Sequence, residues 1–184
     1  MKQGTGLGVY AVIYLVFLYA PILILPVFAL NDSQVVAFPL KGFTTKWFGE
    51  MWADANLRSA LLRSLVIAFS TATIATILGL FAARASVRYR FPGKPAAMGL
   101  IMLPMVLPDI VVAMALLIVL LSLSVPLSML TIIMGHVLLC MPFAVAILTS
   151  AFQSLDRSLE EAALDLGESR AATFRLIILP LVMP

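Results

Sequence analysis

The chain has 184 residues, of which 62% are apolar and 11% are charged, and its net charge is +3. A typical soluble domain has about 25% charged residues, so this chain has too few polar side chains to cover its surface. The mean hydropathy of +1.10 leads to the same conclusion. A single cysteine, Cys140, excludes an intrachain disulfide, and a single histidine, His136, leaves no His/Cys metal cluster. We therefore expect one integral membrane domain over residues 1–184.

Four apolar stretches are long enough to cross about 30 Å of hydrocarbon. They cover about residues 9–30, 64–83, 96–123 and 127–149. All four are predicted to be helices, because an unpaired backbone group is too costly in lipid. The first stretch is longer than the core of a signal peptide and has no cleavage-site pattern of small residues, which favours a retained span.

The third stretch contains an acidic residue, Asp109, and two prolines, Pro104 and Pro108. Measured from Ala96 along a straight helix, Asp109 lies at a depth of roughly 20 Å. A carboxylate at that depth costs at least about 2.5 kcal/mol unless it faces a cavity or a partner. Two interpretations remain open. Asp109 lines a pathway and attracts a cationic substrate, or it caps a helix that begins after Pro108.

The positions of the Lys and Arg residues predict the orientation in the membrane, because these residues are more frequent on the cytoplasmic side. Eight lie on the side of the N-terminus and four on the other. The eight are Lys2, Arg84, Arg88, Arg90, Lys94, Arg157, Arg170 and Arg175, and the four are Lys41, Lys46, Arg58 and Arg63. We therefore expect a cytoplasmic N-terminus.

An amphipathic segment follows the fourth stretch. Its apolar residues recur at the spacing of one helical face: Leu155, Leu159, Ala162 and Leu166. Ser158 with Glu161 has the form of a capping box, Asp156 is an alternative N-cap, and Gly167 suits a helix end. The polar face is acidic, which fits anionic lipid poorly, so we expect a protein partner.

The same segment carries a pattern that resembles the EAA loop of ABC importer permeases. The matching residues are Glu161, Ala162, Ala163, Gly167, Ile177, Leu179 and Pro180. The resemblance implies that residues 154–180 form a cytoplasmic coupling loop that contacts a separate ATPase. It also implies that Glu161, Ala162, Ala163 and Gly167 are the coupling residues, and that the fold is an all-α membrane bundle of the type I importer (MetI-like) class.

Further runs are similar to the spermidine/putrescine importer permeases, and most of all to the second permease subunit of that group. They extend from Gly42 to Trp47, from Arg88 to Pro95, from Pro108 to Val111 and from Asp165 to Ser169. By this resemblance the chain is a permease of the bacterial inner membrane that imports polyamines. Such permeases continue through two more spans, so we expect this chain to be truncated after its coupling loop.

The implied partners are a homologous second permease, a dimer of ATPase subunits, an external substrate-binding protein and the lipid bilayer. The sequence lacks the G-x-x-x-x-G-K-[ST] phosphate loop, so ATP and Mg²⁺ are expected on the partner ATPase, and no cofactor on this chain. Nothing in the sequence suggests an enzyme or a nucleic-acid partner. The alternatives are a permease for another small solute and a passive membrane channel.

Overall fold

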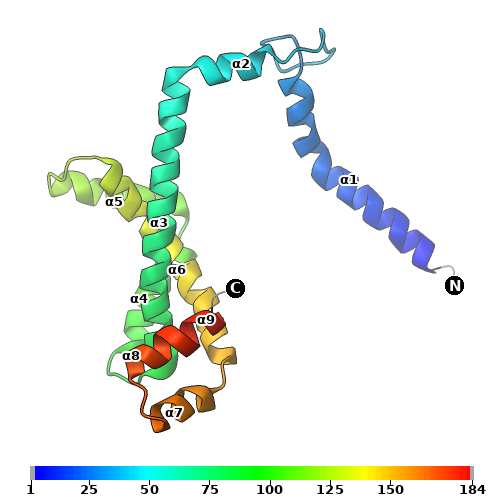
Figure 1. The fold of residues 1–184 in the computed structure, drawn as a ribbon. Coiled ribbons are helices and arrows are strands. Elements are labelled where there is room, and N and C mark those ends of the chain that lie inside the picture. The colour runs from blue at the N-terminus through cyan, green and yellow to red at the C-terminus, as the bar shows by residue number, and fades with distance from the viewer. Residues whose placement is uncertain (1–2, 183–184) are drawn as a thin grey trace. The chain divides into compact units, whose positions relative to one another are not determined.

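The computed structural model describes the backbone of residues 3–182 (Figure 1). Its regular elements over that range are all helical, which confirms the predicted all-α fold. Helices α1 (Gln3–Ala29), α3 (Ala55–Arg88) and α6 (Met129–Ser154) are long and apolar enough to cross a membrane. A bent pair of shorter helices would make a fourth crossing. The chain divides into two units, Met1–Leu62 and Arg63–Pro184, with the boundary inside α3.

In the first unit, a loop between α1 and α2 (Lys46–Ala53) is organised around the buried Asn31. The Asn31 side chain accepts a hydrogen bond from the Lys41 amide at 2.9 Å, and its carbonyl accepts one from the Trp47 indole at 2.8 Å. Lys46 also forms an ion pair with Asp32.

Around α1 itself, apolar side chains are exposed on every side, as expected of a helix whose solvent is lipid.

In the second unit, α3 packs closely on α6 through a row of small residues. Its buried residues recur every four positions and thus form one face of the helix: Thr71, Ala75, Gly79 and Ala83. The approach is closest at Gly79, where an added Cβ would lie 2.7 Å from the Cβ of Ala144 in α6. Small residues at such spacing let helix backbones approach one another within a membrane.

The third apolar stretch forms two helices, α4 (Lys94–Val106) and α5 (Asp109–Ser122), which meet at an angle of 111°. Pro108 has no N–H to continue the helix and forces Leu107 into an extended conformation, with φ −86° and ψ 147°. Pro104, in contrast, lies inside α4. The depth expected for Asp109 assumed a straight helix, and the bend shows that assumption to be wrong.

The C-terminal segment consists of short helices that pack on α3 and α6. They are α7 (Arg157–Asp165), α8 (Arg170–Thr173), the π-helical turn η1 (Phe174–Ile178) and α9 (Leu179–Val182). Figure 1 shows them gathered at one end of α6. Ala83 of α3, Phe152 of α6 and Ile178 of η1 form one fully buried cluster. The segment is therefore anchored to the two long helices by apolar contacts.

Asp156 begins α7 as its N-cap. Its carboxylate accepts a hydrogen bond from the Ser158 amide at 2.9 Å. The bond stabilises the charged form and holds the pKa of Asp156 below its ordinary value of 3.8. Of the two N-caps that the sequence allowed, the structure has Asp156.

The close approach at Gly79 predicts that a larger side chain there will destabilise the packing of α3 on α6. We expect Gly79→Val to lower the free energy of unfolding by about 1–3 kcal/mol, because the new atoms overlap Ala144. Thermal unfolding of the protein in detergent measures the change. Gly99→Val is the control, since no atom lies within 4 Å of a Cβ at Gly99. Equal effects of the two substitutions would contradict the prediction.

The N-cap predicts a pH-dependent stability of α7. Because the pKa of Asp156 is lower in the folded protein than in the unfolded chain, its contribution is complete above pH 3.8 and declines as the pH falls through the folded pKa. Asp156→Ala should therefore increase hydrogen exchange of the α7 amides at neutral pH, relative to intrinsic rates, and increase it less in acid. Asp156→Asn keeps a capping oxygen and should remove the pH dependence. The prediction is wrong if the wild-type protection of α7 does not change with pH.

Candidate functional site

The four predicted coupling residues lie together in α7 and the turn that follows it, but they face different surroundings. Ala163 is only 5% exposed and packs within this chain, whereas Glu161 and Ala162 are exposed. The small side chain of Ala163 thus allows α7 to approach its own protein. Glu161 and Ala162 remain free to contact another molecule.

Gly167 closes α7 in a left-handed conformation, with φ +90°. The amide of Gly167 donates to the carbonyl of Leu164, and the amide of Glu168 to that of Ala163, each at 3.0 Å. Only glycine adopts this conformation without strain. The turn therefore sets the direction in which the chain leaves α7 towards α8.

The apolar face predicted for this segment is largely exposed. Leu155 packs against the buried cluster, but Leu159 and Ala162 are exposed, and Leu166 is 87% exposed. Beside this face lie the acidic residues Glu161 and Asp165. An exposed apolar surface next to charged groups is typical of a site that contacts another protein.

A cavity of about 350 Å³ lies between α7, α8 and the end of α3. Most of its lining residues are charged: Arg84, Arg88, Arg157, Arg170, Glu160 and Glu161. Tyr89, Leu164 and Thr173 complete the lining. Within it, Arg88 Nε donates to Glu160 Oε1 at 2.7 Å. From the sequence, these arginines predicted only the orientation, and no local pattern indicated this ion pair.

Asp109 lies in the first turn of α5, directly after the bend, and its side chain is exposed. The amides of Val111 and Val112 donate to the carbonyl of Pro108, at 2.9 and 3.2 Å. These two amides are therefore bonded to the backbone and not to the Asp109 carboxylate. The carboxylate still lies at the positive end of the α5 dipole, which lowers the cost of its charge.

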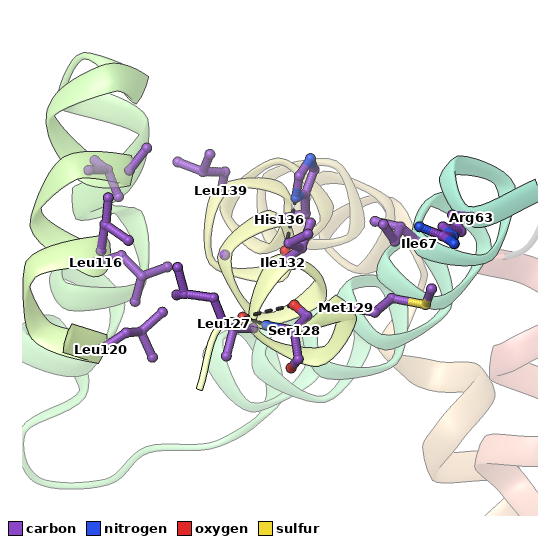
Figure 2. Close-up of a pocket in the computed structure, with 15 residues that line it drawn as sticks. Arg63, Ile67, Leu116, Leu120, Leu127, Ser128, Met129, Ile132, His136 and Leu139 are labelled. Carbon is purple, nitrogen blue, oxygen red and sulfur yellow. Dashed lines mark hydrogen bonds between the residues drawn. The ribbon is translucent and has the colours of Figure 1, made fainter. Parts of the chain in front are cut away.

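A larger cavity of about 720 Å³ lies between α3, α5 and α6 (Figure 2). Figure 2 shows Leu116 and Leu120 of α5 on one side and Leu127 and Leu139 on the other. The polar lining includes His136, whose Nδ1 is 2.9 Å from the carbonyl of Ile132. Asp109 is not among the lining residues, so the structure does not bring the predicted pathway residue to this cavity.

The residues that the structure describes contain no group of three or more His, Cys, Asp or Glu side chains that could hold a metal ion. What the segment 154–180 offers is a short helix with one buried and one exposed face. Such an arrangement can receive a displacement from a partner and pass it to the long helices.

Comparison with known proteins extends the resemblance to most of the chain. The family model described as "binding-protein-dependent transport system inner membrane component" matches residues 75–184. This range includes the last part of α3, the bent pair, α6 and all of residues 154–180.

Individual relatives match over a longer range. The spermidine/putrescine transport system permease protein PotC of Escherichia coli (strain K12) is 40% identical over 184 residues, which are 100% of this chain and 67% of the relative. The putrescine transport system permease protein PotI of the same strain is 39% identical over 175 residues, 91% of this chain and 62% of the relative. PotC of Haemophilus influenzae is 37% identical over 168 residues, 91% of this chain and 65% of the relative. The chain spans about two thirds of the length of these relatives. It belongs to the family of inner membrane components of binding-protein-dependent transport systems.

Proposed function

We propose that this chain is the permease subunit of an ATP-driven ABC importer that carries polyamines across the inner membrane. The observation that supports this most is the 40% identity over the whole chain to a permease named for spermidine and putrescine transport. Identity of that extent covers the bend at Pro108 and the coupling segment as well as the apolar helices. A passive channel would have no use for an exposed coupling helix such as α7.

The exposed carboxylate of Asp109 fits a polyamine substrate, because spermidine and putrescine carry several positive charges. The carboxylate lies at the break between α4 and α5, where the last carbonyls of α4 also lack intrahelical partners. Carboxylate and carbonyl oxygens both attract ammonium groups. We assign Asp109 to the substrate pathway on this ground, because the amides of Val111 and Val112 bond to the Pro108 carbonyl and do not need its carboxylate.

In this proposal, ATP and Mg²⁺ are bound by a separate pair of ATPase subunits, and this chain holds no cofactor. Glu161, Ala162 and Leu166 are the exposed residues that contact the ATPase. ATP binding closes the ATPase pair, the closed pair favours an outward-open membrane state, and hydrolysis releases it. The cluster of Ala83, Phe152 and Ile178 anchors the segment that follows α7 to α3 and α6.

The remaining partners are a homologous second permease and an external binding protein that delivers the substrate. The N-terminus is assigned to the cytoplasm, because eight of the 12 Lys and Arg residues belong to segments on its side of the membrane. That orientation places α7 on the same side as the ATPase. An importer that uses cytoplasmic ATP requires this orientation of α7.

Uptake of radiolabelled spermidine tests the substrate and the role of Asp109. The chain is expressed with the other subunits of its transport system in cells that lack polyamine import. We expect ATP-dependent uptake, and we expect Asp109→Asn to raise the KM for spermidine about tenfold, or about 1.4 kcal/mol, while ATPase activity is retained. Glu50→Gln, an exposed carboxylate in α2, is the control. An assembled complex that hydrolyses ATP without moving polyamines would mean another solute, and an unchanged KM would remove Asp109 from the pathway.

The turn at Gly167 tests the coupling role of α7. A side chain at φ +90° costs about 1–2 kcal/mol of strain and redirects the chain after α7. We therefore expect Gly167→Ala to weaken the stimulation of ATP hydrolysis by the loaded binding protein, with the subunit still inserted in the membrane. Gly99→Ala, in the open surroundings of α4, should have no effect. Unchanged stimulation in Gly167→Ala would contradict the coupling role.

A further inference from the structure

The end of α3 is joined to α7 by an ion pair that is shielded from solvent. Arg88 and Glu160 are 72 residues apart in the sequence, and their atoms Nε and Oε1 lie 2.7 Å apart. The two side chains are only 11% and 16% exposed. In the pair of Lys46 with Asp32, by comparison, the side chains are 47% and 48% exposed. Solvent and salt weaken an exposed pair, whereas a shielded pair holds its two elements in a defined geometry.

Further contacts support the same junction. Arg88 Nη2 donates to the carbonyl of Leu155 at 3.4 Å, just before α7 begins. One turn earlier in α3, the guanidinium of Arg84 lies 4.2 Å from the centre of the Phe174 ring in η1. One face of the end of α3 thus contacts the residues before α7, α7 itself and η1.

We propose that Arg88 and Glu160 are positioning residues that make α3 follow the movement of α7. This inference rests on the proposed coupling role of α7 and identifies the route by which its displacement enters the membrane. α7 has nine residues and is joined to its neighbours by the extended residue Leu155 on one side and the turn at Gly167 on the other. Joints of this kind let a short helix rotate without moving the helices beyond them. The shielded ion pair between α3 and α7 prevents such an independent rotation of α7.

The neighbouring residues Glu160 and Glu161 of α7 then have different contacts. Successive residues of a helix point about 100° apart, so Glu160 and Glu161 cannot both face α3 equally. Glu160 is the less exposed of the two and pairs with Arg88, whereas Glu161 is exposed. Glu161 is therefore available to the ATPase while Glu160 holds α3. From Arg63 to Arg88, α3 contains no proline, so a displacement of Arg88 moves this part of the helix as one body.

The test exchanges the two charges in the assembled transporter. Arg88→Glu and Glu160→Arg each place like charges together, and the double variant restores an opposite pair. We expect each single variant to lower the number of polyamine molecules imported per ATP hydrolysed at least about fivefold, with basal ATP hydrolysis retained. The double variant should recover most of that ratio. Arg90→Glu and Glu168→Arg, alone and together, are the matched controls on exposed positions nearby.

A second readout needs no substrate. Spin labels are attached through Val66→Cys in α3 and Ile147→Cys in α6, both exposed, after Cys140→Ala. We expect ATP to change the distance between the labels in the wild-type background and in the double variant, and not in the single variants. Arg88→Gln, which removes the charge without repulsion, replaces Arg88→Glu if that variant fails to assemble. A nucleotide-dependent distance change that persists in the single variants, or no recovery in an assembled double variant, overturns the inference. A normal distance change without polyamine import overturns only the proposed substrate.

Discussion

The close approach of α3 and α6 is the contact on which the rest of the second unit depends. Gly79 lies against Ala144 with no room for a side chain between them, and the small residues on either side of Gly79 continue the same face. Because the two helices touch along this face, Ala83 and Phe152 meet near its end. Ile178 packs against both residues and is fully buried. The segment 154–180 is anchored there. Bulkier residues on this face would separate the helices and remove that site.

The segment 154–180 has one side that is held by its own chain and one side that is exposed. Ala163 and the Arg88–Glu160 pair hold α7 to its own chain, whereas Leu159, Ala162 and Leu166 remain exposed. A helix that was buried on all sides could not receive a partner, and one that was held on no side could not transmit a force. Under the proposed coupling role, α7 meets both needs because its buried face contacts its own chain and its exposed face is open to a partner.

The sequence predicted those features that depend on neighbouring residues. Continuous apolar runs predicted the long helices α1, α3 and α6. Asp156 was recognised as a possible cap, and Gly167 marked the end of α7 because a left-handed residue is needed there. Features that depend on distant residues were missed. Pro104 and Pro108 look alike in the sequence, yet only the second breaks the helix. Arg88 and Glu160 meet because α3 and α6 pack together, and no local pattern reveals such a pairing.

Leu166 has a consequence for the life of the subunit before assembly. It ends α7 with 87% of its surface exposed, and Leu159 is exposed on the preceding turns. Exposed apolar surface of this kind tends to associate with other apolar surfaces. A copy made without its partners would therefore be prone to aggregate through α7. If α7 docks as proposed, the partner would cover these leucines and remove that tendency.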